Sequence, residues 1–110
     1  MYFNSQALIA LMGDPARAEA AAPAIAASTR RFTSPVAVIE TVTGLAGVTI
    51  EQVEEFLDAQ GIELRDMPPA HRMITAAVTA LAEGSPRLLD AACADYYESE
   101  TFVVPDAAQD

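Results

Sequence analysis

Basic residues are scarce in this chain. It has no lysine and six arginines against sixteen aspartates and glutamates, which gives a formal net charge of −10 at pH 7. Proteins that hold nucleic acid by releasing its counterions usually carry the opposite charge, so tight, sequence-independent binding by this chain alone is disfavoured. A nuclease is not excluded, because clustered carboxylates can hold a divalent cation that supplies positive charge to a phosphate.

Cysteine and histidine are limited to one residue each. Cys93 cannot form an internal disulfide, and we expect a buried, inert thiol. His71 has no second His or Cys at ligand spacing, which argues against a zinc site. We expect His71 to be a surface or packing residue.

Long hydrophobic runs are also missing. No apolar stretch approaches the roughly 18 residues that a membrane-spanning helix needs. The apolar start has no basic residues before it and is interrupted at Asn4, unlike a secretory signal peptide. We therefore expect a cytoplasmic protein without membrane contacts, and 110 residues with 52% apolar content predict a single domain over residues 1–110.

Short strand candidates alternate with helical stretches. Residues 1–3 run into the polar turn Asn4-Ser5-Gln6 and then into an apolar helical run, which predicts strand, tight turn and helix. Such alternation predicts an α/β fold with a parallel central sheet covered by helices on both sides. Further strands are expected at 30–33, 62–67 and 101–104, and further helices at 16–27, 36–45, 49–60, 70–82 and 85–97.

Helix ends have clear local signals. Asp14-Pro15, Ser34-Pro35 and Ser85-Pro86 each combine an N-cap residue with proline at the first helical position. Thr49 and Gln52 form a capping box, and the helix that they begin should stop at Gly61. Within the helix at 16–27, Pro23 is expected to bend or interrupt the backbone.

Glu40 is the only charged residue of the helix at 36–45, whose apolar side chains nearly surround it. A helix of this kind is expected to be buried. A buried carboxylate must be paired, protonated or bound to a metal, so the pattern favours a functional role for Glu40.

Four polar residues stand at structural junctions. Asn4 follows the first strand, Glu40 lies in the apolar helix, Asp90 lies in the first turn of a late helix, and Asp106 follows the last strand. Carboxylates that converge on one cleft repel one another unless a cation lies among them. Oxygen ligands suit Mg²⁺ or Mn²⁺, and the reaction class indicated is metal-assisted hydrolysis of a phosphodiester.

The segments that carry these residues resemble the PIN-domain family, and especially its VapC-like ribonuclease toxins. The opening Asn4-Ser5-Gln6-Ala7-Leu8-Ile9-Ala10 is similar to the family's first motif, in which the first residue is Asp. The run Ser34-Pro35-Val36-Ala37-Val38-Ile39-Glu40 is similar to the segment of the second acid. Leu88-Leu89-Asp90-Ala91 and Phe102-Val103-Val104-Pro105-Asp106 resemble the segments of the third and fourth acids.

This resemblance implies a three-layer α/β/α domain that cleaves RNA in a type II toxin–antitoxin system. It further implies a Mg²⁺ or Mn²⁺ cluster, a cognate antitoxin protein and a homodimer. Catalysis and metal binding would fall to Asn4, Glu40, Asp90 and Asp106. Because Asn4 supplies no negative charge where the family has Asp, we expect this chain to be weakened or inactive.

Two other interpretations stay open. A degenerate PIN scaffold that no longer cleaves RNA would act as a protein-interaction module, which the loss of charge at Asn4 and the net acidity favour. Alternatively, the chain is an unrelated small α/β domain in which Glu40 is a structural buried acid. In that case, neutralising Glu40 should not destabilise the protein.

Overall fold

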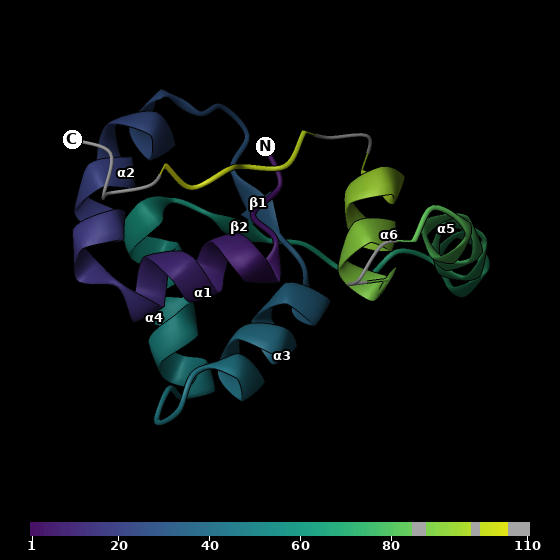
Figure 1. Cartoon of the computed structure of the whole chain (residues 1–110), viewed down its shortest axis with the longest axis horizontal. Helices are drawn as coiled ribbons and strands as arrows, with labels where there is room; N and C mark the ends of the chain where they lie inside the picture. Colours follow the sequence, from purple (N-terminus) through teal and green to yellow (C-terminus); the bar gives the residue numbers. More distant parts are fainter. Residues whose placement is uncertain (85–87, 98–99, 106–110) are drawn as a thin grey trace.

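The structure is a computed structural model that describes residues 1–84, 88–97 and 100–105. Helices and short parallel strands alternate through these ranges (Figure 1), which agrees with the predicted mixed α/β class. In chain order the elements are α1 (Ser5–Gly13), α2 (Pro15–Ala27), β1 (Phe32–Thr33), α3 (Pro35–Gly44), α4 (Ile50–Gln60), β2 (Glu63–Leu64), α5 (Ala70–Ala82) and α6 (Leu88–Tyr96).

The parallel pairing is centred on Tyr2. This residue forms parallel bridges with Phe32 on one side and Thr101 on the other. The Tyr2 amide donates to the Glu100 carbonyl, and the Phe102 amide donates to the Tyr2 carbonyl, each at 2.8 Å. Since β1 also pairs in parallel with β2, four short segments lie side by side, and the predicted parallel direction is confirmed.

The expected strands are shorter than predicted. Within the described residues, only Phe32–Thr33 and Glu63–Leu64 are strands, and the chain around Thr101 forms a single bridge. Arg30 has a positive φ of 53°, so the backbone is still turning where the second strand was expected to begin. Pro68 and Pro69 offer no amide hydrogen with which pairing could continue after β2.

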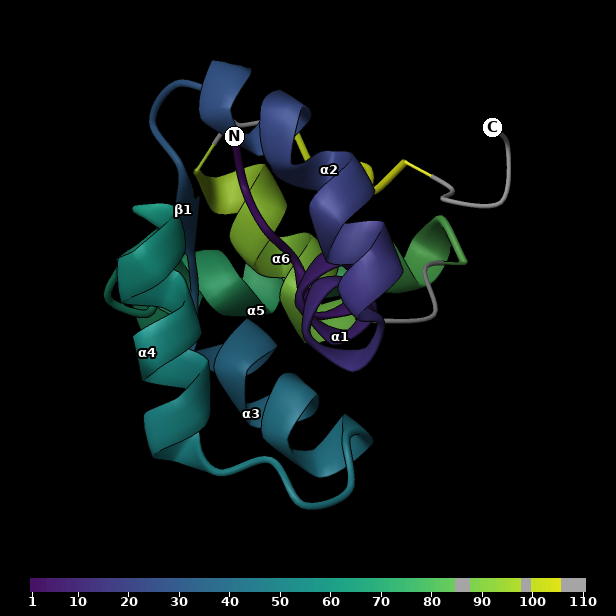
Figure 2. The same cartoon turned by 90° about the vertical axis from the view of Figure 1, so that its left-hand side faces the viewer.

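Neighbouring residues of the first segment point to opposite sides of the strands, as extended backbone requires. Phe3 belongs to a core cluster with residues of α1, α2, α3 and α4, whereas Tyr2 belongs to a second cluster with residues of α5 and α6. In the view turned by 90°, α1, α2 and α4 lie in front and α5 and α6 behind (Figure 2). Helices therefore pack on both sides of the short strands.

The predicted helix starts are confirmed where the structure describes them. The side chain of Asp14 accepts hydrogen bonds from the first amides of α2, and Ser34 accepts from the Ala37 amide at 3.2 Å. Both bonds of the Thr49–Gln52 capping box are present, and Gly61 ends α4 in the left-handed conformation. The Ser85-Pro86 start lies outside the described residues.

Helix α2 continues through Pro23, so the expected interruption is wrong. Alanines of high helix propensity surround the proline. Packing on both sides of it also holds the helix, because Ala21 and Ile25 are buried in the larger core cluster. These contributions offset the loss of one backbone hydrogen bond at Pro23.

Cys93 is fully buried among the residues of the second core cluster. Burial raises the pKa of its thiol above the ordinary value, so the thiolate that would react is disfavoured. The buried position predicted for Cys93 is confirmed, and His71 is exposed at the start of α5 as expected for a surface residue. No helix within residues 1–84, 88–97 and 100–105 is both long and apolar enough to span a membrane.

Candidate functional site

Asp90 lies in the first turn of α6 and is only 2% exposed. Its Oδ2 atom accepts hydrogen bonds from the Ser5 amide at 2.7 Å and from the Ser5 hydroxyl at 2.9 Å. Its Oδ1 atom accepts a hydrogen bond from the Tyr2 hydroxyl. Asp90 therefore ties α6 to the end of the first segment, where α1 begins.

The Tyr2 hydroxyl lies between Asp90 and Ser34. It is fully buried, and its oxygen is 2.7 Å from the Ser34 hydroxyl oxygen. Burial, followed by the hydrogen bond to Asp90 and that residue's charge, raises the pKa of Tyr2. The phenol thus keeps its proton, which it donates to Asp90, and accepts a hydrogen bond from Ser34.

Glu40 reaches the same place from α3. The Ser5 hydroxyl oxygen is 3.0 Å from Glu40 Oε2 and 2.9 Å from Asp90 Oδ2. A hydroxyl has one proton, which it cannot donate to both carboxylates at once. Two carboxylates that meet at one hydroxyl form a site of concentrated negative charge, which favours a nearby cation.

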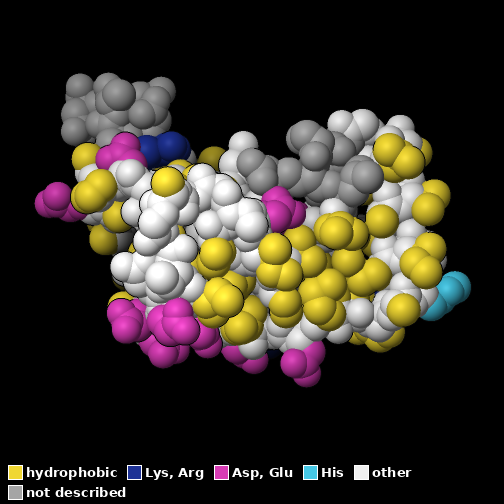
Figure 3. Space-filling view, turned by 90° about the horizontal axis from the view of Figure 1, so that it is seen from below, with side chains coloured by type: hydrophobic (Ala, Val, Ile, Leu, Met, Phe, Trp, Pro, Cys, Tyr) yellow, Lys and Arg dark blue, Asp and Glu magenta, His cyan; other side chains and the backbone are white. Residues whose placement is uncertain are grey.

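The burial predicted for α3 is wrong on one side of the helix. Ile39 is 62% exposed, and Glu40 is partly exposed. Helix α3 packs against α1, α4 and α6, and the side that carries Ile39 stays open. The apolar composition of a helix indicates how much of it could be buried, but it does not indicate how many neighbouring elements cover it. Hydrophobic side chains are accordingly spread over the molecular face that is seen from below in Figure 3.

Asn4 is adjacent to this site in the chain, but its side chain caps a helix. It is the N-cap of α1, and its Oδ1 atom accepts a hydrogen bond from the Ala7 amide at 2.8 Å. Asn4 also lines a pocket of about 390 Å³ together with Gln6, Arg17 and residues 101–104. The structure thus brings Glu40 and Asp90 together at Ser5, the residue that follows Asn4 in the chain. Asp106 lies outside the described residues.

A metal centre remains a prediction. In the part of the chain that the structure describes, no group of three or more His, Cys, Asp or Glu side chains could hold a metal ion. Glu40 and Asp90 supply two carboxylates, Asn4 is an amide, and the fourth predicted ligand is Asp106. Oxygen donors alone are the set that Mg²⁺ and Mn²⁺ prefer.

Three residues of this region were not among the predicted site residues: Tyr2, Ser5 and Arg17. Ser5 is a small polar residue inside the first motif, and Tyr2 carries a hydroxyl in an otherwise apolar segment, so both had a signal in the sequence. Arg17 is one of six arginines that could contact a phosphate, and its place beside Asn4 depends on how α2 packs on α1.

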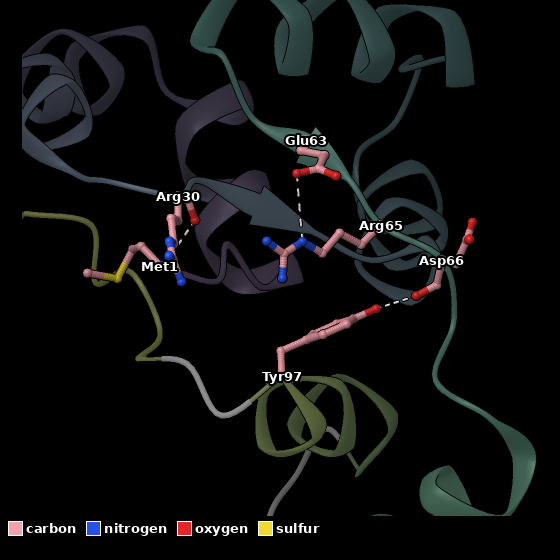
Figure 4. A network of polar contacts seen from close by, with 6 residues as sticks. All are labelled: Met1, Arg30, Glu63, Arg65, Asp66 and Tyr97. Atoms are coloured by element: carbon pink, nitrogen blue, oxygen red, sulfur yellow. Dashed lines mark hydrogen bonds and ion pairs between the residues drawn. The ribbon is translucent and has the colours of Figure 1, made fainter.

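The aromatic residues at the end of α6 serve packing. Tyr97 lies edge-on to Phe32 with 5.2 Å between ring centroids, and its hydroxyl donates to the Asp66 carbonyl (Figure 4). Arg65 stacks over the Phe32 ring at 3.9 Å and lies 3.7 Å from Glu63. The side chains of Tyr97 and Arg65 therefore stabilise the fold through contacts within the protein, which disfavours a role in binding a nucleic acid.

Comparisons with known proteins add no relative to this picture. No protein-family model matches the chain, and neither a curated protein nor a solved structure matches it.

Proposed function

We propose that the chain is a VapC-like PIN-domain ribonuclease with a three-layer α/β/α domain, which hydrolyses RNA phosphodiesters in a type II toxin–antitoxin system. The meeting of Glu40 and Asp90 at the Ser5 hydroxyl, beside Asn4, carries this proposal. In the resemblance to the PIN-domain family, Asn4, Glu40 and Asp90 stand at the positions of the family's first three acids. The proposal includes Mg²⁺ or Mn²⁺ as cofactor and a cognate antitoxin protein as partner.

The residues of the site would divide the work. Glu40 and Asp90, with Asp106, would hold the metal ion, which when bound supplies a polarised phosphate and an activated water. Tyr2 and the Ser5 amide fix the Asp90 carboxylate through hydrogen bonds. Asn4 would contribute a neutral oxygen in place of a charged one, so the metal is held more weakly and the activity of this chain is low or lost.

Calorimetric titration with Mn²⁺ tests the metal site. We expect the parent chain to bind Mn²⁺ and Glu40→Gln to bind it at least about tenfold more weakly, because a full charge near the ion is lost. Glu54→Gln, an exposed position on α4, is the matched control and should bind Mn²⁺ as the parent does. If the parent binds no Mn²⁺ and Glu40→Gln is as stable as the parent, Glu40 is instead a structural acid of an unrelated α/β domain.

The proposal also includes a homodimer, which is supported by exposed apolar side chains on helix α5. Its residues Ile74, Val78 and Leu81 follow one another at helical spacing and are 63%, 62% and 64% exposed. The opposite side of α5 is buried against the protein. None of its residues is Asp or Glu, so two copies of this acidic chain can approach along α5 without bringing carboxylates together.

Analytical ultracentrifugation tests this contact. Val78→Glu should shift a dimer to the monomer, because it buries an unpaired charge in the centre of the interface. Ile50→Glu changes an apolar residue that is 56% exposed on α4 and should leave the dimer intact. A parent chain that sediments as a monomer, or equal dissociation of both variants, would rule out self-association through α5.

A further inference from the structure

The pocket beside Asn4 has an unusual charge for this protein. Among the described residues, its lining comes from Asn4 and α1, from Arg17 of α2 and from the chain at 101–104, and Arg17 is the only charged one of these. The whole chain has a formal net charge of −10. A pocket whose described lining carries one positive and no negative side chain is therefore suited to an anion.

In the described part of the chain, the Arg17 side chain lacks a hydrogen-bond partner at one of its nitrogen atoms. Its Nε atom is buried and has no hydrogen-bond partner within the described residues. A guanidinium carries hydrogen-bond donors and no acceptor, so another group must supply the acceptor. A charged donor without an acceptor costs free energy, and an anionic group that paired with this guanidinium would offset that cost. Arg17 as a whole is only partly buried, so its side chain is accessible to such a group.

Other arginines are already occupied by the fold. Arg31 donates to the Ile25 carbonyl at 2.8 Å and to the Ser28 carbonyl at 2.9 Å. Arg65 is stacked over Phe32 beside Glu63. Arg17 differs from both, because it lines the pocket that Asn4 also lines.

We propose that this pocket is a subsite for a phosphate group of the RNA strand and that Arg17 binds its non-bridging oxygens. The fork of guanidinium N–H groups matches phosphate oxygens in a bidentate arrangement. Gln6 also lines the pocket, and its amide side chain offers further donors. The inference rests on the proposed function, since the shared residue Asn4 places the pocket next to the candidate site of phosphodiester hydrolysis.

Fluorescence anisotropy with a short, labelled, single-stranded RNA in EDTA tests the subsite without metal or cleavage. We expect Arg17→Gln to bind about tenfold more weakly than the parent, and the slope of log affinity against log salt to fall by about 0.7, as for one lost phosphate contact on a single strand. Arg30→Gln removes the same charge from an exposed turn before β1 and should change neither quantity. Arg17→Lys should lie between the parent and Arg17→Gln, because it keeps the charge without the fork.

Equal losses in Arg17→Gln and Arg30→Gln, or no measurable RNA binding by the parent, would overturn the subsite. So would a pocket that binds acetate but not inorganic phosphate in a parallel NMR titration, since its occupant would then be a carboxylate. RNA binding that depends on Arg17 without any cleavage by Asn4→Asp supports the subsite and contradicts the nuclease. Restored cleavage with RNA affinity unchanged in Arg17→Gln supports the nuclease and contradicts the subsite.

Discussion

Replacing Asn4 by Asp is expected to raise Mg²⁺-dependent RNA cleavage by about a hundredfold or more. One charge at about 4 Å from a metal contributes roughly 4 kcal/mol at an effective dielectric constant of 20, before salt screening reduces it. Each 1.36 kcal/mol, as an approximate conversion, corresponds to a factor of about ten in rate. The substitution should not harm the fold, because Asp caps a helix as well as Asn does and its charge suits a helix N-terminus.

Cleavage of a mixed RNA pool, followed on gels with and without EDTA, measures this gain. Ile50→Glu is the matched control: it adds the same charge to the first turn of α4, at a position that is 56% exposed, and should leave cleavage at the parent level. The double variant Asn4→Asp, Glu40→Gln should lose the gain. A folded Asn4→Asp protein that cleaves no RNA, but still retains a small protein partner in a pull-down, would favour the non-catalytic scaffold instead.

Local features of this fold could be predicted from the sequence because the atoms that form them are close in the chain. The Thr49–Gln52 box and the Ser34 cap involve residues three positions apart, and both are found. Strand lengths depend on pairing between distant segments, and the predicted strands were longer than the observed ones. The positive φ of Arg30, which delays β1, has no signature in that residue type.

The candidate site likewise has some features that could be predicted from the sequence and others that could not. The acids were expected to converge because they stand at junctions of a parallel α/β chain, and Glu40 and Asp90 do meet at Ser5. The Tyr2 hydroxyl and the Arg17 pocket depend on side-chain packing between separate elements, which residue types and spacing do not determine. The partial exposure of Glu40 has the same origin, since the number of neighbours around α3 is a property of the tertiary structure.

Asp90→Ala is expected to lower the free energy of unfolding by about 3 kcal/mol or more, because it leaves buried donors without their acceptor. The Ser5 amide and the Tyr2 hydroxyl both donate to this carboxylate, which is 2% exposed. Tyr2→Phe should cost less, about 1 to 2 kcal/mol, since Asp90 keeps its hydrogen bonds from Ser5. Urea unfolding followed by circular dichroism measures both values, and an unchanged m-value would show that the same surface is exposed on unfolding.

The sign of the Asp90 effect separates its two possible tasks. If Asp90 mainly serves the metal ion, its buried charge destabilises the metal-free protein, and Asp90→Ala should be as stable as the parent or more stable. If it mainly joins α6 to the first segment, the loss should appear without metal and far exceed that of Asp58→Ala, an exposed position on α4 where we expect a change within about 0.5 kcal/mol. The hydrogen bonds from Tyr2 and Ser5 favour the second result, so we expect Asp90 to stabilise the metal-free fold and to have its position fixed before any ion binds.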